Sequence, residues 1–146
     1  NSVTYEFLST DIFERYDTHL VFTGVTRNSK RILKNITENL DKVQPLLDTC
    51  DEAYQILSDK KYDEFLNLLK KSWHQKKLTS SSISENEKIQ EIDSVLEKND
   101  SVCAHKLCGA GNGGFFLTFS VKGTLNIPFE SVRIEVEPNG VYGRII

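Results

Sequence analysis

The spacing of the hydrophobic positions changes twice along the chain, and each change predicts a new kind of secondary structure. Near the N-terminus, apolar residues alternate loosely over residues 3–8 and then form a β-branched run over residues 19–26. Both patterns are typical of strands. We therefore expect two strands in this part of the chain, with a short helical turn between them.

From Ser29 the apolar positions lie three and four residues apart, which is the spacing of one helix face. The spacing predicts helices over residues 29–40, 43–57, 62–73 and 84–99. Pro45 fits a first helical turn, and Ser84 with Glu87 fits a capping box at the start of the last helix. The hydroxyl-rich residues 78–84 predict a loop, which could be mobile.

After residue 99 the alternating pattern returns. It predicts strands over residues 102–108, 115–121 and 132–137, a glycine loop over residues 109–114, and a turn at Pro138, Asn139 and Gly140. Residues 141–146 could then close a hairpin. Strands that flank a block of helices, with no internal repeat, predict one α+β domain: a mostly antiparallel sheet with helices packed on one face.

Composition narrows the class of protein. The 146 residues are 38% apolar and 27% charged, which is typical of a globular domain. The net charge is −3 and no basic stripe is present, so nucleic acid is not an expected partner. No apolar run approaches the roughly 20 residues that cross a bilayer. We expect no membrane partner and a cytoplasmic location.

Two further features concern the thiols and the ends of the chain. Cys50, Cys103 and Cys108 are an odd number in a chain large enough to fold without disulfides, so we expect reduced thiols. The sequence begins with Asn1 and contains no methionine. We therefore expect it to be a piece of a longer protein.

The most unusual segment is residues 106–116, KLCGAGNGGFF, with four glycines within six residues. Glycine loses the most backbone entropy on folding, so such a cluster indicates left-handed backbone or a close approach to another object. Successive exposed amides can form an anion-binding concavity, and Lys106 beside it could supply a countercharge. The alternative is a tight turn between two strands.

The stretch KLCGAGNGGFFLTF resembles the third signature of kinases of the galactokinase, homoserine kinase, mevalonate kinase and phosphomevalonate kinase (GHMP) superfamily. HLVFTGVTRNSKRIL and SWHQKKLTSSSIS are similar to the branch that phosphorylates heptose phosphates. The resemblance covers about residues 5–140. It departs at Asn112, which stands where glycine is usual. Because Asn tolerates left-handed backbone, we expect the turn to be retained.

The resemblance implies that residues 1–146 are a ferredoxin-like C-terminal domain. It would pack against an N-terminal domain that supplies the ATP-binding loop and, in several members, a catalytic Asp. Neither motif is in this chain, so the catalytic residues are expected in the other domain and this chain alone is expected to be inactive. The implied reaction uses ATP and Mg²⁺ to phosphorylate a sugar or sugar phosphate, such as a heptose 7-phosphate at its anomeric hydroxyl.

The resemblance also suggests site residues. Those near the phosphate would be Lys106, Gly109, Ala110, Gly111, Asn112, Gly113 and Gly114. Those that bind the substrate would be Thr23, Arg27, Lys76 and Lys77.

Each suggestion has a simpler alternative. Arg27 could hold a sugar phosphate through two hydrogen bonds, or it could be a solvated arginine at a helix start. Trp73 could stack on a sugar, but it also continues an apolar helix face, which favours core packing. For the whole chain, the alternative is a stand-alone α+β module that binds a small anion or other ligand for regulation.

A metal site is not expected. Cys103, His105 and Cys108 are residue types that bind zinc. On a strand, however, Cys103 and His105 would point to one face and Cys108 to the other. Cys108 could line the site as a thiol, or pack as a small buried hydrophobe.

Overall fold

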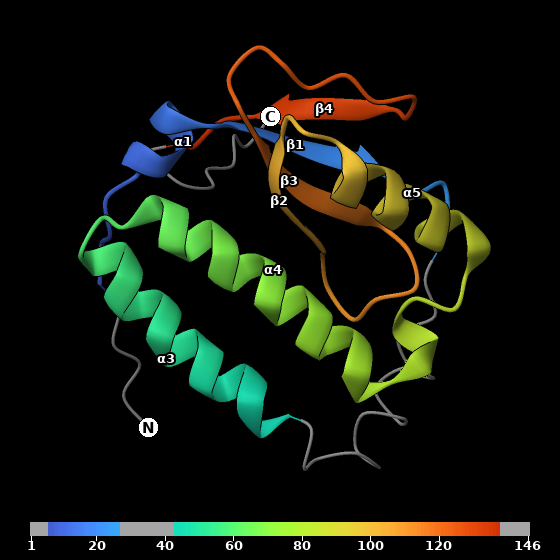
Figure 1. The fold of residues 1–146 in the computed structure, drawn as a ribbon, viewed down its shortest axis with the longest axis horizontal. Helices are drawn as coiled ribbons and strands as arrows, with labels where there is room; N and C mark the ends of the chain where they lie inside the picture. Colours follow the sequence, from blue (N-terminus) through green and yellow to red (C-terminus); the bar gives the residue numbers. More distant parts are fainter. Residues whose placement is uncertain (1–5, 27–42, 138–146) are drawn as a thin grey trace, which may run out of the picture.

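The computed structural model describes residues 6–26 and 43–137 of the chain (Figure 1). Within these ranges it forms a four-stranded sheet with helices around it. In chain order the elements are α1 (Asp11–Arg15), β1 (Asp17–Phe22), α3 (Gln44–Ser58), α4 (Tyr62–Thr79), the 3₁₀ turn η2 (Ser81–Ile83), α5 (Glu87–Lys98), β2 (Val102–Leu107), β3 (Phe115–Ser120) and β4 (Ser131–Ile134).

The sheet has the order β2-β3-β1-β4, and every neighbouring pair is antiparallel. This is the strand order of the ferredoxin-like β-α-β-β-α-β pattern. The predicted α+β class and antiparallel sheet are confirmed. β1 pairs with β3 from Asp17 opposite Ser120 to Phe22 opposite Phe115. The glycine loop connects β2 to β3, so it lies at the end of the sheet where β1 finishes.

Apolar clusters lie on both faces of the sheet. Phe116 and Phe119 are three residues apart on β3, so their side chains point to opposite faces. The Phe116 face is covered by α5, and the Phe119 face by α1 and α4, so the helices divide between the faces. Trp73 of α4 also reaches the Phe116 face. The buried members there are Val21, Trp73, Ile83, Ile89, Ile92, Leu96, Val102, Leu107 and Phe116; on the other face they are Ile12, Tyr16, Tyr62, Leu66, Ala104 and Phe119.

The connection from β3 to β4 departs from the ferredoxin-like pattern, in which a second helix would lie there. Residues 121–130 contain no helix. Instead Leu125, Ile127 and Phe129 pack against the cluster around Phe116. The alternating apolar residues of this connection take the place of a helix.

Two predictions around the start of α5 are corrected. The predicted capping box of Ser84 and Glu87 is absent: Asn86 is the N-cap, and its side chain accepts a hydrogen bond from the amide of Lys88 at 2.9 Å. The Ser84 amide instead donates to the Ser81 carbonyl and so closes η2. The Ser84 carbonyl accepts from the side chain of Gln90 at 2.9 Å.

The hydroxyl-rich segment is not an open loop, which is a second correction. α4 continues to Thr79, and η2 follows after Ser80. Thr79, Ser80, Ser82 and Ile83 are all buried. The Ser80 hydroxyl accepts from the amide of Ser82, and the Thr79 hydroxyl donates to the Lys76 carbonyl at 2.8 Å. Local hydroxyl-to-backbone bonds therefore fold the segment tightly against the core.

Other element boundaries differ by a few residues. The short helix between the first two predicted strands is confirmed as α1, but residues 6–8 form no strand. β1 ends at Phe22 rather than residue 26 because Thr23 turns towards the glycine loop. The predicted helix over residues 29–40 and the hairpin beyond residue 137 lie outside the described residues. Within the described ranges, no helix has the length and apolar character needed to cross a membrane.

Candidate functional site at the glycine loop

The loop between β2 and β3 is held in left-handed backbone. Five of the six residues from Gly109 to Gly114 have positive φ, and the non-glycine among them is Asn112, at 52°. The prediction that Asn112 keeps the turn is confirmed. The glycine values are 69° for Gly109, 110° for Gly111, 146° for Gly113 and 91° for Gly114. The glycine density is therefore required by the conformation.

Neighbouring segments support the loop on two sides. On one side the Asn112 amide donates to the carbonyl of Ile83 at 2.8 Å. On the other, Gly114 donates its amide to Val25 and accepts at its carbonyl from the amide of Thr23 at 3.0 Å and its hydroxyl at 2.8 Å. Thr23 is 1% exposed, so its hydroxyl supports the loop from beneath.

Gly111 is the tightest position. A Cβ atom added there would lie 2.9 Å from Cγ2 of Ile83 and 3.1 Å from its backbone Cα. Its φ of 110° is also one that side-chain-bearing residues rarely adopt. The first constraint comes from Ile83 of η2, so the buried serine-rich segment limits the space at this position of the loop.

Several polar groups of the loop remain without partners among the described residues. The amides of Gly109, Ala110, Gly111 and Gly113 make no hydrogen bond there. The side-chain oxygen of Asn112 is also buried without a partner there. Buried polar groups are normally paired with protein, water or ligand. The loop is therefore not closed by its own hydrogen bonds, as a plain hairpin turn would be, and its amides can receive an anion.

The three candidate lysines lie in different surroundings. Lys76 of α4 donates to the carbonyls of Leu107 at 3.0 Å and Gly109 at 2.5 Å, so it fixes the first turn of the loop. Lys106 of β2 donates to the Ser72 hydroxyl at 2.7 Å. Burial lowers the pKa of Lys106 below its ordinary value. The loop thus has Lys76 bound to its backbone and Lys106 directed to α4.

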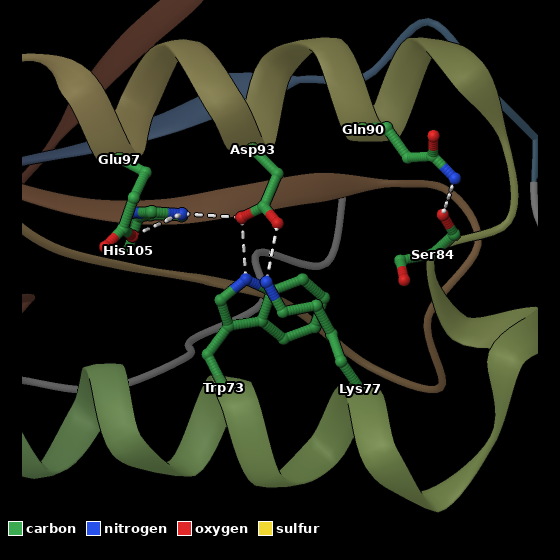
Figure 2. A network of polar contacts seen from close by, with 7 residues as sticks. All are labelled: Trp73, Lys77, Ser84, Gln90, Asp93, Glu97 and His105. Carbon is green, nitrogen blue, oxygen red and sulfur yellow. Dashed lines mark hydrogen bonds and ion pairs between the residues drawn. The ribbon is translucent and has the colours of Figure 1, made fainter.

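Lys77 belongs to a separate cluster, the Asp93 network, which consists of Trp73, Lys77, Asp93 and His105 (Figure 2). One carboxylate oxygen of Asp93 accepts from Trp73 Nε1 and lies 2.7 Å from His105 Nε2; the other accepts from Lys77 Nζ at 2.8 Å. Burial acts to raise the pKa of Asp93. The hydrogen bonds from His105, Lys77 and Trp73 outweigh it and hold the pKa well below its usual range.

This network settles the role of the tryptophan. Trp73 is 1% exposed and packs edge-on to Phe116, with ring centroids 5.8 Å apart. The interpretation as a core residue is confirmed. Lys77 is tied to Asp93, and among the described residues no hydrogen bond joins it to Lys106 or to the loop.

A cavity adjoins the loop on the α3 and α4 side of β2. Its volume is about 500 Å³, and Lys76, Lys106 and Gly109 all line it. The structure therefore brings these three predicted residues together. Cys108 is half-buried and also lines the cavity. Cys50 and Ser72, which the sequence did not single out, complete its polar lining with Thr49.

The remaining candidates lie elsewhere. Arg27 is outside the described residues. His105 contacts Asp93, and Cys103 packs beside Phe119 on the other face. A bulge in β2 between Val102 and Ala104 interrupts the alternation of side chains. Cys103 and His105 therefore do not point to one face as predicted. Among residues 6–26 and 43–137, no three His, Cys, Asp or Glu side chains gather as metal ligands would.

Comparison with known proteins identifies the fold. No family model and no curated protein matches the sequence. The structure is similar to the mevalonate kinase of L. major in complex with R-mevalonate, with a TM-score of 0.61 and 14% identity over 74% of this chain and 34% of that one. It is also similar to the mevalonate kinase of methicillin-resistant Staphylococcus aureus MRSA252, with a TM-score of 0.55 and 18% identity over 81% of this chain and 36% of that one.

These identities are low, so the likeness establishes the fold alone: an α+β fold that this chain shares with part of each of these mevalonate kinases. The chain spans about a third of the length of each of these kinases.

Proposed function

We propose that this chain is the substrate-side domain of an ATP-dependent small-molecule kinase. The acceptor would be a sugar or sugar phosphate, and most specifically D-glycero-D-manno-heptose 7-phosphate at its anomeric hydroxyl. The proposal combines the fold with the sequence stretches that resemble the heptose-phosphate branch. An N-terminal domain of the same protein would bind ATP and supply the catalytic residues.

The observation that carries the proposal is the conformation of the glycine loop. Its left-handed residues turn four amides away from the hydrogen bonds of the hairpin, and η2 and the end of β1 hold them in place. Phosphoryl transfer requires positioning and neutralisation of charge more than covalent chemistry from the protein. Amides that are already fixed can stabilise the transferred group without reorganising.

The loop offers donors but no metal ligands. Residues 106–116 contain no Asp or Glu, and Mg²⁺ prefers carboxylate, phosphate and water oxygens. The residues present therefore do not fit a metal site of their own. In the proposed kinase, Mg²⁺ would be held by the nucleotide and the other domain, and this chain would contribute the loop and its two lysines.

The intact protein tests the proposal when it is mixed with ATP and a panel of sugars. The panel should include heptose 7-phosphate, a hexose 6-phosphate and the unphosphorylated sugars. ADP release and ³¹P NMR of the product report the reaction. We expect a new anomeric phosphate, formed fastest from the heptose phosphate. Absence of transfer to every acceptor would favour the alternative, a stand-alone anion-binding module.

Gly111→Val tests the loop itself. The valine would face Ile83 and a φ of 110°, and displacing reacting groups by about 1 Å can cost roughly 100-fold in rate. We expect kcat to fall by about that factor. The matched control is Gly123→Val, which also has positive φ but has open space around it and lies outside the loop. Thermal unfolding of both variants separates loss of fold from loss of rate. Unchanged kcat in folded Gly111→Val would mean that the loop is only a turn.

A further inference from the structure

The cavity beside the loop, here called the Lys106 cavity, differs in chemistry from a sugar site. It lies between α3 and α4 and the loop end of β2 and β3, with a volume of about 500 Å³. Half of the residues that line it are aliphatic or aromatic, and no Asp or Glu is among the described residues that line it. The apolar wall is formed by Leu46, Ala53, Phe65, Leu68, Leu69, Leu107 and Leu117.

Lys106 is the charged group in this apolar setting. Its Nζ donates to the neutral hydroxyl of Ser72 and forms no ion pair with any carboxylate of the described residues. Lys76, the other lysine of the wall, donates to two backbone carbonyls. Lys106 is half-buried, and a partly buried charge without a countercharge carries part of the cost of burial. Burial accordingly lowers the pKa of Lys106. An anion placed beside Nζ would remove that cost.

We propose that the Lys106 cavity binds a monocarboxylate with an apolar body of about ten carbons, in a size range typical of small-molecule pockets. The carboxylate would accept a hydrogen bond from Lys106 Nζ, and the body would pack between α3 and α4. Lys106 can give a carboxylate one charge-assisted hydrogen bond, and Lys76, the second lysine of the wall, already donates to two backbone carbonyls, whereas a doubly charged phosphate would need more cations. The site rests on these residues and not on the proposed kinase reaction.

Isothermal titration of the intact protein with sodium decanoate tests the site. We expect a dissociation constant of about 100 µM or tighter. The neutral analogue 1-decanol should bind at least about tenfold more weakly, because it lacks the charge-assisted hydrogen bond. The heat of decanoate binding does not depend on ATP turnover. The protein could therefore bind decanoate even if it had no kinase activity. If no binding is detected at 1 mM decanoate, about ten times the expected dissociation constant, the proposal is overturned.

Lys106→Met removes the charge and keeps an unbranched side chain of similar length. We expect decanoate binding to weaken by about 10- to 100-fold. The melting temperature without ligand should rise, by roughly 3 °C, since an uncompensated ammonium is replaced by an apolar group. The matched control is Lys71→Met, which removes an exposed lysine of α4 that pairs with Glu52 outside the cavity. It should leave decanoate binding unchanged.

A second variant fills the cavity without changing its charge. Ala53→Phe adds an aromatic ring from α3 to the apolar wall. We expect it to block decanoate, with circular dichroism checking that the protein still folds. If this variant does not fold, Ala53→Leu repeats the test with less added volume. Decanoate affinity that is equal in wild type and Lys106→Met, or a lowered melting temperature in Lys106→Met, would show that the lysine is structural and would overturn the proposal.

Discussion

Two polar regions adjoin α4, and each includes a lysine. In the Asp93 network, Lys77 faces a carboxylate that also accepts from an indole and contacts an imidazole. In the Lys106 cavity, Lys106 faces one hydroxyl and an apolar wall. A fully connected network of buried groups stabilises one structure. A cation without a countercharge instead leaves interaction energy for a ligand. The countercharge therefore separates a structural cluster from a candidate binding site: Lys77 has a carboxylate partner, and Lys106 has none among the described residues.

Removing the centre of the network should give the largest effect. In Asp93→Ala, the Lys77 ammonium, the Trp73 indole and His105 all lose their shared partner. The side chain of Asp93 is only 16% exposed. Breaking a buried pair from one side costs about 3–5 kcal/mol, and Lys77 at 25% exposure can reach water. We expect a loss of about 3 kcal/mol in the free energy of unfolding, measured by urea denaturation.

Glu97→Ala is the matched control for that substitution. Glu97 lies one turn after Asp93 on α5 with a side chain that is 48% exposed, and it stays 3.9 Å from His105 (Figure 2). It should change the free energy of unfolding by less than about 0.5 kcal/mol, as exposed pairs do. Similar losses in both variants would mean that the network has no special role.

Lowering the pH should have the next largest effect on the stability of the network. The pKa of Asp93 is held below its usual range in the folded protein. A carboxyl group with a depressed folded pKa contributes stability that is complete above the unfolded value, about 4, and is lost as the pH falls towards the folded value. The stability difference between wild type and Asp93→Asn should therefore shrink as the pH is lowered from about 6 to about 3. A difference that stays constant over that interval would contradict the assigned role.

The smallest effect is expected on the other side of α4. The Ser72 hydroxyl accepts from Lys106 and donates to the Leu69 carbonyl. Ser72→Ala should cost only about 0.5–1 kcal/mol, because the hydroxyl is neutral and the cavity leaves room for water at Lys106. A loss above about 2 kcal/mol would place this region in the same class as the Asp93 network.

Periodicity was enough to predict much of the fold. The 3-and-4 spacing located α3, α4 and α5, and alternation located β1 to β4. The start of α5 could not be predicted reliably because Ser84 and Asn86 are both good caps. In the structure the cap is Asn86, because the Ser84 amide already donates to the Ser81 carbonyl in η2. The buried serine segment was also missed, because hydroxyl residues indicate turns but not whether a turn is covered.

The site was predictable in its backbone and less so in its side chains. Glycine density identified the loop, and positive φ at five positions follows from it. The destinations of Lys76, Lys77 and Lys106 depend on how α4 is rotated against β2, which local spacing does not determine. Asp93 could not be found from the sequence either. It lies between the buried Ile92 and the exposed Ser94 on α5, and it gains its partners only when α4 and β2 meet it.

The register of β1 has a consequence for how this chain reaches its native state. β1 lies near the start of the sequence, yet its residue Asp17 pairs with Ser120, which is 103 residues further along the chain. Contacts so distant require a large loop to close first, and they slow folding. The neighbouring helices α3 and α4 have a short connection and can associate quickly. During synthesis, β1 must therefore wait for most of the chain to leave the ribosome, and in that interval its apolar edge depends on protection from aggregation.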